Sequence, residues 1–196
     1  MRSKKWLDRN KKDFFVKEAK EKGYLSRAAF KLIEINKKFK FIENSKNILE
    51  LGSSPGGWSQ VIFEINPKVK SYGFDLLEMK YSNERYIFIK DDFLNYNYKN
   101  FINKFDLILS DIAPNTTGHK STDHLRLASI IEDIISIIKN ISSINSNFVF
   151  KIWKGSEEKK IIDQLKKIYS EVLYFKPSSS RSESSEIYIV AKKFIG

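Results

Sequence analysis

The sequence predicts an α/β protein with a seven-stranded, mostly parallel sheet, helices on both faces, and a last pair of strands that is antiparallel. From residue 47 onward, short runs of β-branched and aromatic residues alternate with segments of helical periodicity. Such alternation produces a mostly parallel sheet that is covered by helices on both sides. The last two runs are separated only by PSSSRSESS, which is too short for a helical crossover, so these two strands must pair antiparallel.

Each expected element has residues of a suitable type. The strands are rich in Val, Ile, Phe and Tyr, and they are expected at NILELG (47–52), SYGFDL (71–76), YIFIKDD (86–92), FDLILSD (105–111), NFVFKIW (147–153), VLYFK (172–176) and EIYIVAKK (186–193). Helices are expected between them at 58–65, 123–141 and 157–169. Two more are expected near the start, DRNKKDFFVKEAKEKG (8–23) with Asp8 or Asn10 as N-cap and Gly23 as its stop, and SRAAFKLIEINKKF (26–39) with Ser26 as N-cap.

The chain, residues 1–196, is expected to form one domain, with residues 1–45 as a basic helical extension packed on it. The sequence has no cysteine, as is typical of a reducing compartment. We therefore expect an intracellular protein, cytoplasmic or organellar, and mitochondrial if a leader was removed. No apolar run is long enough to cross a bilayer, so no membrane partner is expected, and a monomer is the default.

The charge of the chain is strongly positive. Lys and Arg number 35 against 24 Asp and Glu, which gives a net charge of +11, and the excess is concentrated in the first 40 residues. A field of this sign attracts polyanions, so nucleic acid is a candidate partner. Solvated helix faces in a lysine-rich protein would give the same totals. Charge alone does not separate these two interpretations.

A glycine-rich turn, LELGSSPGGWSQ (49–60), follows the first strand and opens a helix. Gly52 permits a tight turn, while Gly56 and Gly57 allow the backbone to approach a ligand closely. In an open α/β sheet, ligands bind beyond the carboxyl ends of the strands, where this turn lies. Pro55 and the bulky Trp58 replace the small residues of a dinucleotide-binding turn, so the pattern disfavours NAD.

Two carboxylates end the next two strands and complete a predicted cofactor pocket. Asp75 is placed to accept hydrogen bonds from a ribose diol, and Asp92 from an adenine amino group. Each acid alone is as well explained as a strand-end cap or turn former. The glycine-rich turn and the two acids in this order together indicate S-adenosylmethionine.

The stretch FVFKIWKG (148–155) has a lysine, Lys151, in the middle of a buried strand. An ammonium ion is expensive to bury unless it is paired or gives up its proton. A lone lysine in a strand more often lies near the solvent end or extends its amine to water. Lys151 is therefore a candidate functional residue that needs support from its surroundings.

The support comes from a family resemblance. The segments SRAAFKL, LGSSPGGWSQ, FDLL, DDF, SDIAPN, FVFKIWKG and KPSSSRSESSEIYIVA occur in this order between about residue 6 and residue 193. Together they resemble the FtsJ/RrmJ family of RNA 2′-O-methyltransferases, and the combination of the first, second and fifth segments is highly specific. The resemblance implies a Rossmann-like fold, S-adenosylmethionine as cofactor, no metal, and RNA as substrate.

The resemblance also implies the functional residues. The implied catalytic set consists of Lys31 in SRAAFKL, Asp111 in SDIAPN, Lys151 in FVFKIWKG and Glu186 in SSEIY. The implied cofactor contacts are Gly52, Ser53, Pro55, Gly56, Gly57, Trp58, Asp75, Leu76, Asp92, Phe93 and Asp111.

Lys151 is expected to be the proton acceptor in this set. Methylation of a ribose 2′-hydroxyl requires loss of its proton, and a base works best when it titrates near the working pH. Burial and a second cation lower the pKa of a lysine, whereas a carboxylate raises it. We expect Asp111 to orient Lys151 and the methyl group, while Lys31 and Glu186 position the ribose.

Among RNA substrates, the resemblance is closest to the enzymes that methylate a uridine of large-subunit ribosomal RNA. Naked RNA and a ribosomal large-subunit particle are both possible substrates. A transfer-RNA anticodon-loop methyltransferase is the alternative, and a non-catalytic RNA-binding module is a further one. The basic N-terminal helices are the expected RNA platform, with Trp6 as a candidate for stacking on a base and Arg181 available to a phosphate.

Overall fold

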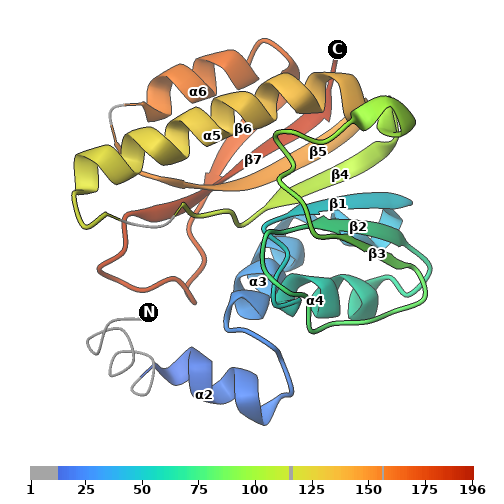
Figure 1. Cartoon of the computed structure of the whole chain (residues 1–196). Coiled ribbons are helices and arrows are strands. Elements are labelled where there is room, and N and C mark those ends of the chain that lie inside the picture. Colours follow the sequence, from blue (N-terminus) through green and yellow to red (C-terminus); the bar gives the residue numbers. More distant parts are fainter. Residues whose placement is uncertain (1–12, 115–116, 156) are drawn as a thin grey trace.

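The computed structural model describes residues 13–114, 117–155 and 157–196. Within these residues the central feature is a seven-stranded sheet in the order β3-β2-β1-β4-β5-β7-β6 (Figure 1). The strands are β1 (Asn47–Leu51), β2 (Lys70–Phe74), β3 (Tyr86–Ile89), β4 (Phe105–Ser110), β5 (Ser142–Trp153), β6 (Tyr169–Phe175) and β7 (Glu186–Phe194). Strands β1 to β5 pair parallel, and β7 runs antiparallel to both of its neighbours. The predicted fold class is confirmed.

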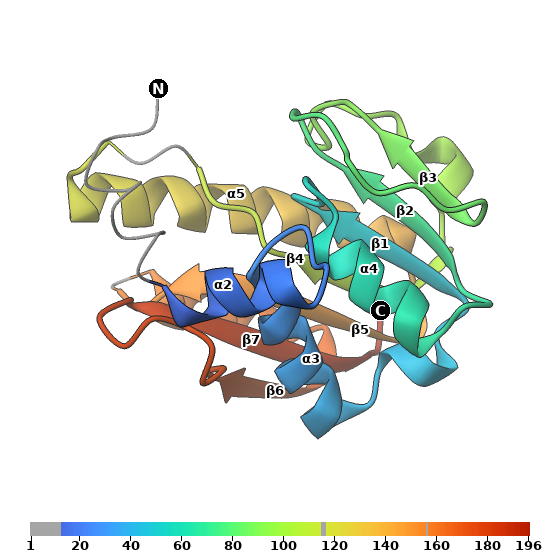
Figure 2. The same cartoon turned by 90° about the horizontal axis from the view of Figure 1, so that it is seen from below.

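Helices cover both faces of the sheet. Figures 1 and 2 show α3 (Ala28–Phe39) and α4 (Gly57–Ile65) on one face, and α5 (Lys120–Ile141) and α6 (Glu158–Leu165) on the other. A short helix, α2 (Phe14–Glu21), precedes α3 on the same side, and two 3₁₀ turns, η1 (Ile42–Asn44) and η2 (Tyr98–Phe101), lie in connections. No helix among the described residues is long and apolar enough to cross a membrane.

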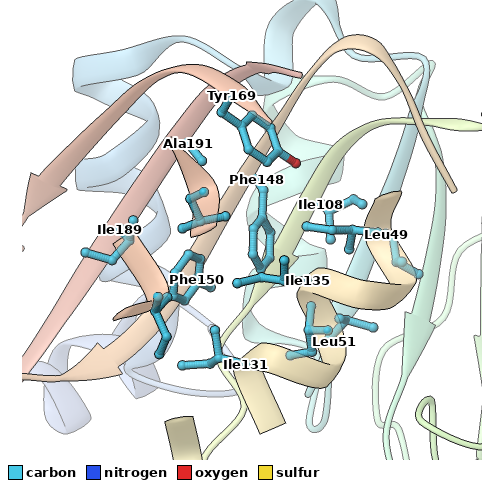
Figure 3. Packing of buried hydrophobic residues seen from close by; sticks show 14 of the residues in the cluster. Leu49, Leu51, Ile108, Ile131, Ile135, Phe148, Phe150, Tyr169, Ile189 and Ala191 are labelled. Carbon is cyan, nitrogen blue, oxygen red and sulfur yellow. The ribbon is translucent and has the colours of Figure 1, made fainter. Parts of the chain in front are cut away.

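Alternation along the strands divides the buried side chains between two clusters, one on each face. On the α5/α6 face, Phe148 and Phe150 of β5 stack with ring centroids 4.6 Å apart and pack against α5 residues such as Ile131 and Ile135 (Figure 3). On the α3/α4 face, Val149 packs with residues of α3 and α4. Because side chains alternate with a period of two, Lys151 lies on the α3/α4 face with Val149.

All seven strands and the helices between them are where they were predicted, but several boundaries differ. Strand β5 begins at Ser142 rather than 147, β6 begins at Tyr169 rather than 172, and β3 ends at Ile89 rather than 92. The helix expected at 157–169 ends at Leu165, because Tyr169 begins β6, and α5 begins earlier than expected, at Lys120. Ser26 is not the N-cap of α3; the cap position is Arg27, without a side-chain cap bond.

The first described helix is capped by a residue other than those expected. Asp13 caps α2 and accepts a hydrogen bond from the Val16 amide at 3.4 Å. The candidate caps Asp8 and Asn10, and the candidate stacking residue Trp6, lie outside the described residues. Gly23 follows α2 with a φ of +76°, as expected of a helix stop.

Candidate active site

The four residues of the implied catalytic set come together at one edge of the sheet. Asp111 follows β4 and Lys151 lies near the end of β5, so both are at the carboxyl edge of the parallel strands. Because β7 is antiparallel to β5, its first residue, Glu186, lies at that same edge, opposite Trp153. Helix α3 adds Lys31 from the covering layer.

Lys151 is paired directly with Asp111. Its Nζ lies 2.9 Å from Oδ1 and 2.6 Å from the main-chain carbonyl oxygen of Asp111, and its side chain is only 7% exposed. Burial pushes the pKa of Asp111 upward, but the charges of Lys151 and Lys31 and two hydrogen bonds outweigh it, so the pKa is lowered. Asp111 is therefore an ionised carboxylate, and its charge offsets the free-energy cost of burying the Lys151 side chain.

Lys31 and Glu186 form the neighbouring pair. The Lys31 Nζ lies 2.7 Å from Oε1 and 2.8 Å from Oε2 of Glu186, and both side chains are 12% exposed. The Ser180 hydroxyl, from the loop before β7, donates to Glu186 Oε1 at 2.9 Å. This carboxylate is thus held from both the covering helix and the preceding loop.

Tyr188 joins the two pairs, and the sequence interpretation missed it. Its hydroxyl donates to Asp111 Oδ1 at 2.7 Å, and Lys31 Nζ lies 5.8 Å from its ring centroid. Burial first, and then the charge of Asp111, raise the pKa of Tyr188 well above its ordinary value, so it remains a neutral donor. The available signal was its position two residues after Glu186, on the same face of the strand.

The glycine-rich turn is fixed against the helix that carries Lys31. A Cβ on Gly57 would lie 2.2 Å from the Ser26 hydroxyl oxygen, so glycine permits α4 to approach the start of α3. The indole N–H of Trp58 donates to the Ala28 carbonyl at 2.8 Å. A Cβ on Gly56, where φ is +113°, would lie 2.5 Å from Tyr81 Cβ. The close approaches that the structure gives these two glycines are therefore to protein, and a ligand contact stays a prediction.

The two predicted cofactor acids organise the turns that follow their strands. Asp75 accepts from the amides of Ser54 and Leu77 at 2.9 and 2.8 Å. Asp92 accepts from the Leu94 amide at 3.0 Å and from the Asn95 side chain at 3.1 Å. A carboxylate has about four acceptor sites, so each acid retains capacity for a ligand.

The other predicted cofactor residues divide by exposure. Leu76, beside Asp75, is 67% exposed and offers apolar surface next to a carboxylate. Trp58 and Phe93 are buried among hydrophobic neighbours. Gly52 makes the tight turn expected of it, with a φ of +76°, and a Cβ there would lie 2.9 Å from Ile112 Cγ1. Ser53 is buried and Pro55 half-buried in the same turn.

Known proteins are similar to this chain over almost its whole length. The family model described as FtsJ-like methyltransferase matches residues 24–194. Ribosomal RNA large subunit methyltransferase E of Zymomonas mobilis is 39% identical over 198 residues, which cover 99% of this chain and 90% of the relative. The protein of the same name from Coxiella burnetii is 38% identical over 205 residues, which cover 99% of this chain and 96% of the relative.

A solved structure from Plasmodium falciparum, described as a ribosomal RNA methyltransferase, shares the fold. Its TM-score is 0.77 at 32% identity, and the match covers 88% of this chain and all of the other. The family model spans most of the chain, including all four residues of the implied catalytic set. This chain therefore belongs to the FtsJ-like methyltransferase family.

Proposed function

We propose that this protein transfers a methyl group from S-adenosylmethionine to a ribose 2′-hydroxyl of RNA, at a uridine of large-subunit ribosomal RNA. The observation that carries the reaction is that two largely enclosed ion pairs, Lys151–Asp111 and Lys31–Glu186, meet at Tyr188, whose hydroxyl donates to Asp111. The names of the similar bacterial proteins support large-subunit RNA as the substrate. A transfer-RNA ribose is the alternative substrate.

Lys151 is suited to accept the hydroxyl proton. To act as the base, Lys151 must first release its own proton. The neutral amine then has two N–H groups and one lone pair, and Asp111 offers two acceptors, its carboxylate and its main-chain carbonyl. With both N–H groups donated to Asp111, the lone pair is directed away from that residue, toward the position we assign to the ribose hydroxyl. When bound, S-adenosylmethionine would supply an electrophilic methyl group. Its sulfonium sulfur would keep the electron pair of the broken S–CH3 bond and leave as a neutral thioether.

The second ion pair and the glycine-rich turn have binding roles in this proposal. Lys31 and Glu186 line a cavity of about 120 Å³ and present both a donor and an acceptor to the hydroxyl groups of a ribose. The turn at residues 52–58, with Asp75, Leu76 and Asp92, holds the nucleoside part of the cofactor. Asp111 lies between these regions, where its negative charge favours a sulfonium.

An RNA substrate also accounts for the basic charge of the chain. A net charge of +11 attracts polyanions and supplies the part of RNA affinity that does not depend on sequence. We propose that the protein acts as an intracellular monomer on ribosomal RNA or on a large-subunit particle.

Methyl transfer to several RNAs in parallel tests the proposal. Large ribosomal subunits, naked large-subunit RNA and transfer RNA are incubated with labelled S-adenosylmethionine, and the modified nucleotide is mapped. We expect label on a uridine 2′-oxygen of large-subunit RNA. Label confined to transfer RNA would establish the alternative, and label on a base would contradict the proposed chemistry.

A further inference from the structure

Two arginines beside the candidate active site converge on a single carboxylate oxygen. Arg181, in the loop before β7, places Nε 3.0 Å and Nη2 2.9 Å from Asp13 Oδ2. Arg27, immediately before α3, donates from Nη1 to the same oxygen. The Asp13 side chain is only 8% exposed. The arrangement therefore encloses one anionic oxygen between two guanidinium groups.

This geometry is that of a site for an oxyanion. Two arginines held this close repel each other unless an anion lies between them, and the rigid fork of N–H donors suits carboxylate and phosphate oxygens alike. Arg27 is fixed further, because its Nη2 donates to the Ser179 carbonyl oxygen. The Arg27 guanidinium group is thus held in part by a contact that does not depend on the bound anion.

The arginine pair is continuous with the pocket of the catalytic set. The cavity of about 120 Å³ is lined by Arg27, Lys31, Arg181, Ser184 and Glu186. In an RNA chain the 3′-phosphate is attached to the carbon next to the one that bears the 2′-hydroxyl. A ribose held by Lys31 and Glu186 consequently brings a backbone phosphate toward the arginines.

The residue that now occupies the anion site belongs to a lightly packed helix. Asp13 caps α2, and its cap hydrogen bond is long at 3.4 Å. Among the eight residues of α2, only Ala19 is buried, and Phe14 is 68% exposed. Figure 2 shows α2 outside α3, on the face that carries Lys31. Displacing α2 from Arg27 and Arg181 therefore disturbs little of the core.

We propose that Asp13 stands in for an RNA phosphate: it pairs with Arg27 and Arg181 in the free protein and yields them to a backbone phosphate next to the methylated ribose. This inference rests on the proposed function, since it requires RNA as the substrate. When a phosphate replaces the Asp13 carboxylate, one anion replaces another. Arg27 and Arg181 are therefore paired with an anion both in the free protein and in the RNA complex. Asp13 thereby lowers the affinity for RNA and favours ligands that can displace it.

The test measures the affinity for a large-subunit RNA transcript as a function of salt. Asp13→Asn removes the competing charge and keeps a good N-cap, so we expect binding about three- to tenfold tighter than wild type. Arg181→Ala should weaken binding and reduce the slope of log affinity against log salt by about 0.7 to 0.9, the value of one phosphate contact. In the Arg181→Ala background, the gain from Asp13→Asn should shrink, because the two changes act on one contact.

The control is Lys160→Ala, on α6 at the opposite face of the sheet, where Lys160 pairs with Glu132. We expect this change to leave the salt slope as it is in wild type. Calorimetry with S-adenosylmethionine verifies that each variant is folded.

Unchanged or weaker RNA binding by a folded Asp13→Asn variant would overturn the inference and leave Asp13 as a structural cap. If that variant does not fold, the salt slope of Arg181→Ala decides, and an unchanged slope overturns the phosphate site. Failure of the wild type to methylate any RNA would instead overturn the proposed function.

Discussion

The Lys151 side-chain nitrogen contacts two oxygens of one residue, the carboxylate of Asp111 at 2.9 Å and its main-chain carbonyl at 2.6 Å. The two residues belong to the ends of adjacent strands, β4 and β5, so the sheet itself fixes their separation. This double contact leaves one direction at the nitrogen for a substrate.

Tyr188→Phe removes the hydroxyl that donates to Asp111 but keeps the ring that packs against Trp58. We expect a loss of about 0.5–1.5 kcal/mol in unfolding free energy, as is typical of one hydrogen bond. A positioning role also predicts a several-fold lower kcat with little change in KM for RNA, because the Asp111 carboxylate loses one of the bonds that orient it. Chemical denaturation and steady-state kinetics on the same preparation check both effects. An unchanged kcat would restrict Tyr188 to a structural role.

Because Glu50 is a buried carboxyl group, we expect the free energy of unfolding to depend on pH. It is 1% exposed in β1 and accepts from Ser59 at 2.9 and 3.1 Å, and its burial raises its pKa to about 8. An unfolded glutamate titrates near about 4.3, so between these values the folded state binds the proton more tightly. The stabilisation that protonated Glu50 contributes is complete below the pKa of the unfolded state. It decreases by about 1.4 kcal/mol per pH unit as the pH rises toward the pKa of the folded state.

Glu50→Gln keeps the shape and removes this titration. Unfolding in urea at pH 5 and pH 8 should show wild type losing stability relative to the variant as the pH rises. Parallel changes in wild type and variant would show that Glu50 ionises in the folded protein without cost.

Gly57→Ala tests whether the glycine-rich turn holds the helix that carries Lys31. The new Cβ would lie 2.2 Å from the Ser26 hydroxyl oxygen, and such overpacking costs about 1–3 kcal/mol. We expect lower stability and weaker methyl transfer, because α3 must shift away from α4. Ser26→Ala removes the clashing oxygen, so the double variant should recover much of both losses. A double variant no better than Gly57→Ala would indicate a different cause.

The strands could be predicted because each combines suitable residues with an unambiguous connection, as PSSSRSESS illustrates before β7. The association of Lys151 with Asp111 was expected from the family resemblance, and the structure gives its physical basis, since β4 and β5 are neighbouring parallel strands. Ser26 was predicted as a cap from local sequence alone, but its hydroxyl lies where α3 meets Gly57, a contact made only in the folded chain. A local sequence pattern cannot show whether the Ser26 hydroxyl caps its own helix or packs against another helix.

The anion site could not be predicted for a related reason. Asp13 and Arg181 are 168 positions apart, and no strand pairing connects them. One open interpretation was that Asp75 and Asp92 stabilise the turns after their strands. The hydrogen bonds that they accept from backbone amides agree with this interpretation. Their roles toward a cofactor stay predictions.

Substitution of Lys151 tests the central claim most directly. Lys151→Ala removes the proposed base, and Lys151→Arg keeps a positive charge opposite Asp111 but cannot give up its proton. Lys192→Ala, on the far part of β7 where Lys192 pairs with Glu171, is the matched control.

The measurement is single-turnover methyl transfer to large-subunit RNA, with S-adenosylmethionine binding checked by calorimetry. We predict that both Lys151 variants bind the cofactor yet transfer at least about 10²-fold more slowly, as expected for loss of a general base, while Lys192→Ala matches wild type. A Lys151→Ala variant that binds S-adenosylmethionine and transfers at the wild-type rate would contradict the account.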